Sequence, residues 1–344
     1  MKKLFFVLML MISLLFISSC SIVKIYNDSF IALGTVIDLT IYDNDDALKH
    51  YKEVLNIMRD ITKASSAYKQ YADSSVSIYA LNENKVVLND NKYFDILKEL
   101  LNYSIEIKNT TNGYFNPLIG SISFKWKDII EEYNKTNDSS VISFSSNEIN
   151  NYLSEINNSE LVITDDYIEL KGNALIDLGA IAKGYATKKA IEYLDNASCN
   201  KYILNAGKSN IAFGTKPKKE FNIMLTDYDT KDNKITNIGN IVGNNMTITT
   251  SAMGEQSFYY DGNYYHHIIS PIDGYPKSYY TTVSIFNLDP MLSDAYATAI
   301  FSMDIDEAKA FIEENDLEAI LYSNIGNKGY IYKSIKVGDY FYEN

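Results

Sequence analysis

Hydrophobic positions along the chain follow a helical period in some segments and a strand period in others. Apolar residues recur every three to four positions over residues 48–61 and over about residues 93–108. Both segments are predicted to be core helices, and Asn112-Gly113 is expected to end the second. Residues 35–42 alternate and are rich in β-branched side chains, which predicts a strand.

The rest of the chain mixes short strands with helices at irregular intervals, which favours an α+β fold with a mixed sheet over a βαβ repeat. Residues 161–170 predict a hairpin, and a helix is expected over residues 180–194. Residues 134–158, rich in Asn and Ser, are predicted to be a surface excursion with one weak helix. Further strands are predicted near residues 201–205, 210–214, 221–226, 247–250, 257–260, 264–269 and 280–286, followed by helices near 292–303 and 305–315 and a last pair of strands.

The N-terminus has the pattern of an export signal. Two lysines are followed by an apolar run over residues 4–17 and by two serines before Cys20. So short an apolar run, with basic residues before it and small ones after it, predicts a signal peptide rather than a membrane span. Residues 17–20 resemble a bacterial lipobox, a signal in which the cysteine is acylated and becomes the first residue of the mature protein.

We therefore expect removal of residues 1–19, a lipid anchor on Cys20 and a tether over residues 20–30. The protein would then be held on the extracytoplasmic face of a bacterial cell membrane. An uncleaved anchor and a plain secretory signal are the alternatives.

Composition limits the partners and the chemistry. The chain has 44 acidic and 31 basic residues, a formal net charge of −13, and the predicted loss of two N-terminal lysines makes it −15. A surface this acidic repels nucleic acid, which we do not expect as a partner. Arg59 is the only arginine, so an anion would be held by lysine, backbone amides or a metal ion. Cys199 is left without a disulfide partner.

Residues 176–186 hold small side chains where a helix is expected to begin, and Lys183 lies in that first turn. Free backbone amides and a lysine at a helix N-terminus could cradle a diphosphate. A tightly packed small-residue helix with a surface lysine would give the same pattern. The chain has no Cys/His cluster, no G-x-S-x-G and no Walker or Rossmann glycine pattern, which argues against zinc hydrolases, serine hydrolases and P-loop proteins.

Two more segments carry candidate chemistry. Asp294 and Thr298 are four residues apart on a predicted helix, so a carboxylate and a hydroxyl share one face. These hard oxygen donors suit Mg²⁺, although an ordinary hydrogen-bonded helix surface has the same spacing. His266 and His267 are adjacent at a strand end, where one can face a site and the other face away, and simple packing of both is the alternative. His50 is expected to be solvated.

In this order the segments resemble the ApbE family, the FAD:protein FMN transferases, over about residues 31–332. Residues 177–186 match the family signature Asp-Leu-Gly-x-Ile-Ala-Lys-Gly-Tyr-Ala without a break. The other matching positions are Leu33-Gly34-Thr35, Ser66-Ala67-Tyr68, residues 112–117, Thr250-Ser251, His267 with residues 274–276, and Asp294 with Thr298. The chain departs from the family pattern at Leu33, Asn116, Ala206, Ser270 and Asp273.

The resemblance implies an ApbE-like, T-fold-related α+β fold in one large domain over residues 31–340, in a family whose members are often exported lipoproteins. Asp294, Thr298 and the backbone carbonyl of Ala180 would hold Mg²⁺ against the diphosphate of FAD. The residues implied to contact FAD are Leu33, Tyr68, Ala180, Lys183, Thr250 and His267.

The resemblance also implies a reaction. A threonine hydroxyl of an extracytoplasmic target flavoprotein would attack the FMN phosphorus and expel AMP, leaving a phosphoester-linked flavin. His267 would act as the base at the reacting phosphate, because a threonine hydroxyl is a weak nucleophile. An FAD diphosphatase that releases FMN and AMP, and a non-catalytic flavin-binding lipoprotein, are the alternatives.

Overall fold

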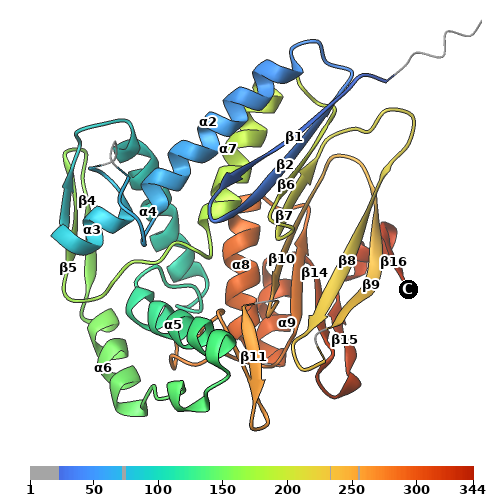
Figure 1. Cartoon of the computed structure of the whole chain (residues 1–344). Coiled ribbons are helices and arrows are strands. Elements are labelled where there is room, and N and C mark those ends of the chain that lie inside the picture. Colours follow the sequence, from blue (N-terminus) through green and yellow to red (C-terminus); the bar gives the residue numbers. More distant parts are fainter. Residues whose placement is uncertain (1–22, 72–74, 233, 255) are drawn as a thin grey trace, which may run out of the picture.

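An eight-stranded sheet forms the centre of the protein (Figure 1). The structure is a computed structural model that describes residues 23–71, 75–232, 234–254 and 256–344. The predicted signal peptide and Cys20 lie outside these residues. In spatial order the strands are β1 (Ile25–Ala32), β2 (Thr35–Tyr42), β6 (Tyr202–Ala206), β7 (Asn210–Phe213), β10 (Met246–Ala252), β13 (Thr282–Phe286), β14 (Glu318–Ser323) and β15 (Gly329–Lys333).

Helices cover one face of this sheet, and a smaller sheet covers the other. Val283 and Ile285 of β13 are buried on the helix side, whereas Phe286 packs in a second core with Phe221 and Phe341 of the smaller sheet. Alternate residues of one strand thus serve two layers. The helices nearest the site are α2 (Ala47–Ser65), α4 (Tyr93–Thr110), α5 (Gly120–Thr136), α7 (Ala182–Asn196) and α8 (Pro290–Ser302), and the smaller sheet has the order β16 (Phe341–Glu343), β9 (Lys234–Gly243), β8 (Phe221–Asp229).

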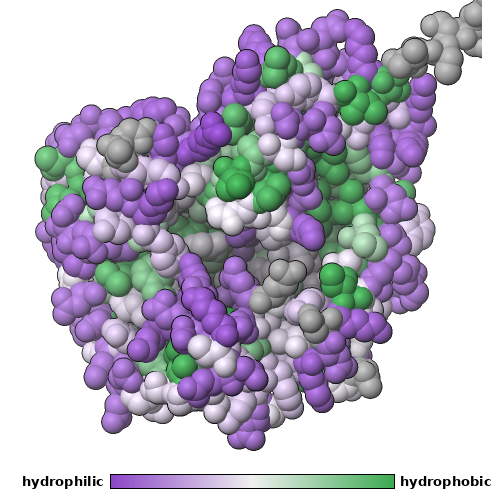
Figure 2. Space-filling view, viewed as in Figure 1, coloured by the Kyte–Doolittle hydropathy of each residue, from purple (hydrophilic) through white to green (hydrophobic). Residues whose placement is uncertain are grey.

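The remaining elements lie around the two cores. One three-stranded sheet has the order β3 (Val86–Leu88), β5 (Tyr167–Lys171), β4 (Glu160–Ile163), and a hairpin pairs β11 (Ser257–Tyr260) with β12 (Asn263–His266). The other helices are α3 (Ile78–Asn84), α6 (Ser146–Asn157) and α9 (Ile305–Glu314). No helix in the described part of the chain has the length and apolar character to cross a membrane. Most of the face in Figure 2 is hydrophilic.

The α+β class and the single large domain are confirmed. The sheet differs from the mixed one we expected, because every ladder between the described strands of the large sheet is antiparallel. Helices α2, α4, α7, α8 and α9 agree with the predicted ones to within a few residues.

The structure differs from the predicted fold in three segments. The tether expected over residues 20–30 becomes a strand from Ile25 onward, since β1 pairs with all of β2. The helix predicted within residues 134–158 is present as α6, and most of the segment is exposed, but Ile149 and Ile156 of α6 are buried in the main core. Strand β9 was not predicted at all. Local composition misled in each case, since these segments gain their order from distant partners.

His50 is also placed wrongly by the sequence. It is 6% exposed, and its Nδ1 lies 3.0 Å from the hydroxyl of Tyr193. The packing of α2 against α7 creates this contact. The charged residues next to His50 in the sequence do not indicate a contact with Tyr193.

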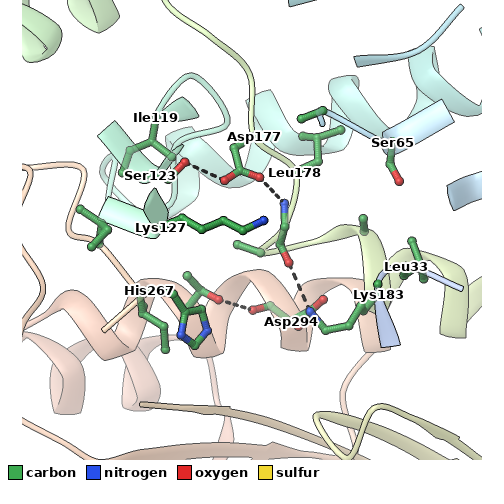
Figure 3. A pocket seen from close by; sticks show the side chains of 18 of the residues that line it. Leu33, Ser65, Ile119, Ser123, Lys127, Asp177, Leu178, Lys183, His267 and Asp294 are labelled. Atoms are coloured by element: carbon green, nitrogen blue, oxygen red, sulfur yellow. Dashed lines mark hydrogen bonds between the residues drawn. The ribbon is translucent and has the colours of Figure 1, made fainter. Parts of the chain in front are cut away.

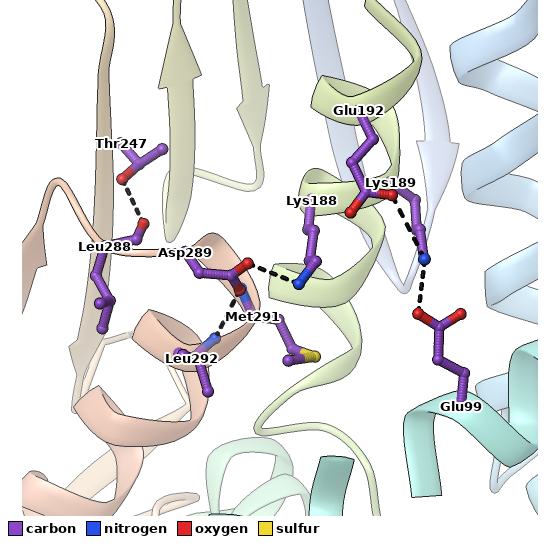
Figure 4. Close-up of polar contacts among 9 residues, drawn as sticks. All are labelled: Glu99, Lys188, Lys189, Glu192, Thr247, Leu288, Asp289, Met291 and Leu292. Carbon is purple, nitrogen blue, oxygen red and sulfur yellow. Dashed lines mark hydrogen bonds and ion pairs between the residues drawn. The ribbon is translucent and has the colours of Figure 1, made fainter. Parts of the chain in front are cut away.

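The contact between α7 and α8 fixes the geometry from which the site is built (Figure 4). Asp289 caps α8 by accepting from the backbone N–H groups of Met291 and Leu292, at 3.0 and 3.2 Å. Its second oxygen lies 2.8 Å from the ammonium of Lys188 on α7. One carboxylate therefore stabilises the start of α8 and ties it to α7.

Helix α7 is held on its other flank by α4 (Figure 4). The ammonium of Lys189 lies 2.7 Å from Glu99, and the second Glu99 oxygen accepts from the hydroxyl of Tyr185 at 2.7 Å. Thr247 of β10 donates to the carbonyl of Leu288, just before α8, at 2.8 Å. These contacts leave α7 and α8 little freedom to shift.

Gly184 lets the two helices approach closely. A Cβ at this position would lie 2.3 Å from the carbonyl oxygen of Pro290 and 2.6 Å from the Cβ of Asp294. The sequence left two interpretations of these small residues, a diphosphate cradle and a tightly packed helix. The close contact at Gly184 supports the tight packing.

We predict that Gly184→Ala destabilises the protein by about 1–3 kcal/mol, because the new methyl group meets backbone atoms that cannot rotate away. Urea unfolding followed by circular dichroism measures this change. Gly338→Ala is the matched control, since a Cβ there meets nothing within 4 Å, and its effect should stay within about 0.5 kcal/mol. Equal stability of the two variants would contradict the close approach of the helices.

Candidate active site

A cavity of about 540 Å³ lies among α5, α7, α8 and the loops around them, within the usual range for small-molecule sites. Figure 3 shows side chains from these elements converging on it. Of the predicted site residues, those that line the cavity are Leu33, Tyr68, Ala180, Lys183, His267, Asp294 and Thr298. Residues from distant parts of the sequence therefore meet in one site.

Asp294 is a buried carboxylate at the wall of this cavity. It is 4% exposed. One oxygen accepts from the backbone N–H of Gly184 at 2.8 Å, and the other accepts from the side-chain amide of Asn210 at 3.2 Å. Burial raises the pKa of Asp294, while the charge of Lys183 and these two hydrogen bonds work against that rise.

A second layer of side chains orients Asp294, and no sequence pattern indicates it. Thr249 of β10 donates to the amide oxygen of Asn210 at 3.0 Å, and this bond orients the amide so that its NH₂ group points at the carboxylate. Asn210 and Thr249 are each 1% exposed. Isolated asparagine and threonine residues in short strands look like any others, so no sequence signal marks them.

Asp294 makes no ion pair with any residue that the structure describes. A desolvated carboxylate without a cation is unfavourable, so this side of the cavity is suited to a positive ion. Thr298 lies one turn further along α8, with its hydroxyl 3.1 Å from the Asp294 carbonyl and 3.4 Å from the hydroxyl of Ser251. The backbone of Ala180 faces the same cavity.

These donors fit Mg²⁺. The described residues contain no group of three or more histidine, cysteine or acidic side chains that could hold a metal by themselves. A cation here would therefore combine Asp294, Thr298 and a carbonyl with oxygens of its ligand. Mg²⁺ favours that arrangement, because it binds few protein groups and completes its shell with water and phosphate oxygens.

Lys183 and the loop before it form the next wall. Its ammonium lies 3.3 Å from the carbonyl oxygen of Gly179. Asp177 stabilises this loop by accepting from the backbone N–H of Gly179 at 2.9 Å and from the hydroxyl of Ser123 at 2.7 Å. Figure 3 shows both hydrogen bonds. The signature segment is thus held in place from α5.

The histidine pair divides as the strand pattern predicted. His266 is fully buried, donates from Nε2 to the carbonyl of Lys277 at 2.8 Å and packs edge-on against Phe301. His267 faces the cavity. Its Nδ1 lies 3.4 Å from the carbonyl oxygen of Gln256. A carbonyl only accepts, so Nδ1 carries the hydrogen and Nε2 keeps a free lone pair.

His267 is neutral over the physiological pH range. Burial of the ring against the cavity wall, followed by the charge of Lys183, lowers the pKa of His267 to about 4, while the rest of the side chain stays exposed to the cavity. The ring can therefore accept a proton at neutral pH.

Leu33 and Tyr68 lie at the cavity rim. Leu33 and Gly34 have φ values of 52° and 72° and form the two-residue turn between β1 and β2, the geometry of a type I′ hairpin. The backbone N–H of Leu33 donates to the hydroxyl of Thr62 on α2 at 3.0 Å. Tyr68 is 54% exposed, with its ring centre 4.8 Å from that of Phe124.

Thr250 is the one predicted contact residue that the structure does not bring to the cavity. Its hydroxyl lies 2.9 Å from that of Ser284 on the neighbouring strand β13. Ser251, the next residue, lines the cavity instead. Successive side chains of a strand point to opposite faces, so an error of one position moves the assignment to the wrong side.

The positions that depart from the family pattern keep local structural roles. The side-chain oxygen of Asn116 accepts from the backbone N–H of Leu118 at 3.1 Å. Ser270 accepts from the backbone of Ile272 at 3.3 Å, and Asp273 pairs with Lys277. The turn after His267 is therefore closed by its own side chains.

Known proteins share sequence and fold with this chain. The model of the ApbE family matches residues 33–321. A FAD:protein FMN transferase of Klebsiella pneumoniae (strain 342) is 23% identical over 304 residues, 86% of this chain and 89% of that protein. The one of Treponema pallidum (strain Nichols) is 30% identical over 149 residues, 40% of this chain and 41% of that protein.

Solved structures show the same fold. The flavin transferase ApbE from Vibrio cholerae has a TM-score of 0.73 at 17% identity and covers 93% of this chain and 100% of its own. The ApbE protein from Thermotoga maritima MSB8 has a TM-score of 0.72 at 22% identity and covers 92% of this chain and 99% of its own.

The ionisation of His267 is open to direct measurement. We predict that ¹⁵N-histidine NMR finds a pKa near 4 for His267, with the hydrogen on Nδ1 above that pH. Lys183→Met should move this pKa upward, since the lysine charge disfavours the protonated ring. The matched control is Lys125→Met, which removes a lysine charge outside the cavity. A pKa near 6.5 in the unaltered protein would contradict this electrostatic account.

Proposed function

Because this chain belongs to the ApbE family, we propose that it transfers FMN from FAD to a threonine hydroxyl of a target flavoprotein. It is a flavin transferase by family, like its named relatives. One observation carries the chemical part of the proposal. A single cavity brings together a buried carboxylate that forms no ion pair with a described residue, a lysine in the first turn of a helix and a neutral histidine.

The carboxylate supports a metal-dependent reaction. Asp294, Thr298 and the carbonyl of Ala180 would hold Mg²⁺, which would neutralise negative charge on the diphosphate of FAD. Lys183 would contact the same phosphates from α7, aided by the positive end of the helix. The chain has a single arginine, Arg59 on α2, so these groups supply the charge that arginines supply elsewhere.

His267 would activate the nucleophile. Its free Nε2 would take the proton of the acceptor threonine as the threonine oxygen forms a bond to the FMN phosphorus. The bond from that phosphorus to the bridging oxygen would break, and AMP would leave with that oxygen. The hydrogen bond from Nδ1 to the Gln256 carbonyl keeps the ring in the tautomer that this role requires.

The acceptor would be an exported electron-transfer protein. The N-terminal pattern predicts a lipid anchor on Cys20, which would hold this chain at the extracytoplasmic face of the membrane beside such partners. An acidic surface would keep the domain away from anionic lipids, so the lipid itself would provide the attachment.

Hydrolysis of FAD is the second candidate, and one observation favours it. His267 is exposed to solvent in the cavity, so water could take the place of the threonine hydroxyl. The same site would then release FMN and AMP as a diphosphatase.

A transfer assay tests the proposal. The purified protein would be incubated with FAD, Mg²⁺ and an exported flavoprotein that bears the acceptor threonine, and the partner analysed by mass spectrometry. We expect a mass increase equal to one FMN, and none on a partner with that threonine changed to valine. Free FMN and AMP without labelling would indicate the diphosphatase, and intact bound FAD would indicate a non-catalytic flavin protein.

Two substitutions test whether transfer requires the carboxylate of Asp294. Asp294→Asn should lower transfer by about 10²–10³-fold, since it removes the charge that would hold the cation. Asp273→Asn is the matched control, because that carboxylate pairs with Lys277 and does not line the cavity. Thermal unfolding confirms that both variants fold. Equal transfer rates in the two variants would remove Asp294 from the mechanism.

A further inference from the structure

The cavity holds a second lysine that the proposed reaction leaves unused. The described cavity lining contains two lysines, Lys127 and Lys183, and no arginine. Lys127 lies on α5, one turn after Ser123, so both side chains leave the same face of that helix. Ser123 holds Asp177, whereas Lys127 reaches into the cavity itself. Figure 3 shows its extended side chain directed between Asp177 and His267.

The ammonium of Lys127 rests on an aromatic ring. Its Nζ lies 3.6 Å from the centre of the Tyr68 ring, and Phe124 supports that ring from the side at 4.8 Å between ring centres. Phe124 and Lys127 both belong to α5. A cation–π contact of this kind orients the ammonium and leaves its N–H donors available to other groups.

Lys127 forms no ion pair with any described carboxylate, in a chain where acidic residues exceed basic ones by 13. A half-buried ammonium that makes no described ion pair gains when an anion enters the cavity. Hydrogen bonds between an ammonium and phosphate oxygens are stronger than an exposed cation–π contact.

We propose that Lys127 is a specificity-determining residue that binds phosphate oxygens of the incoming nucleotide, from the side of the cavity opposite Lys183. Tyr68 holds the ammonium ready while the cavity is empty, and the lysine exchanges the ring for the phosphates when the nucleotide enters. The cavity then selects phosphorylated ligands over an uncharged flavin. This inference rests on the proposed function, because it takes a diphosphate as the ligand.

Binding measurements test this role without any acceptor protein. Wild-type protein, Lys127→Met and Lys127→Arg would be titrated with FAD, ADP and riboflavin in EDTA, so that no metal ion contributes charge. Methionine keeps the length of the side chain and removes its charge. We expect Lys127→Met to weaken FAD and ADP binding by roughly 10- to 100-fold and to leave riboflavin binding unchanged. Lys127→Arg should restore most of the loss.

Two controls separate a charge effect from a structural one. Lys125→Met removes a lysine from the same helix that does not line the cavity, and it should bind all three ligands as the wild type does. Raising the salt concentration should reduce the difference in FAD and ADP affinity between the wild type and Lys127→Met, because salt screens the lysine charge. If Lys127→Met lost riboflavin binding as strongly as FAD binding, Lys127 would serve ring stacking or packing and the proposal would be overturned. Unchanged FAD binding in Lys127→Met would also overturn it.

The outcome for this inference is distinguishable from that for the proposed function. If the wild type binds ADP in a Lys127-dependent way but transfers no FMN to a partner, the inference stands and the transferase proposal fails. If transfer proceeds and Lys127→Met binds FAD and ADP as tightly as the wild type, the inference fails alone. If the wild type binds neither nucleotide in EDTA and also transfers no FMN when Mg²⁺ is present, both fail.

Discussion

The site depends on one buried carboxylate at the contact between two helices. Asp294 is held by a backbone N–H from α7 and by the amide of Asn210 from β7, and it can reach both only because Gly184 allows α7 and α8 to approach closely. The cap and ion pair of Asp289 fix the same contact one turn earlier. Stability and chemistry therefore share one requirement, since any change that separates these helices also moves the charge at the cavity wall.

Burial has the largest effect on the ionisation of Asp294 and His267, and the charge of Lys183 acts on both. Its charge opposes the effect of burial on Asp294, which favours the ionised carboxylate. The same charge adds to the effect of burial on His267 and favours the neutral ring. A cation-binding carboxylate and a proton-accepting histidine need these two states. One lysine in the first turn of α7 thus serves both groups in a protein that has almost no arginine.

The sequence predicted the parts of the site that lie close together along the chain. The pairing of Asp294 with Thr298, the first turn of α7 and the division of labour between His266 and His267 all follow from local periods of helix and strand. Contacts between residues far apart in the sequence could not be predicted in this way. Asn210 is 84 residues from the carboxylate that it orients, and the partner of His50 is 143 residues away. The error at Thr250 has another origin, since a motif match fixed the segment but not which of two neighbouring residues faces inward.

The claim at the centre of this account is that the unpaired carboxylate of Asp294 holds a cation beside a bound nucleotide. A crystal structure of the protein with FAD and Mn²⁺ in place of Mg²⁺, with anomalous diffraction to locate the metal, tests it most directly. The account predicts a manganese peak within coordination distance of Asp294 and Thr298, in contact with the FAD diphosphate. FAD bound in the cavity with no metal at Asp294, or with the metal held elsewhere, would contradict it.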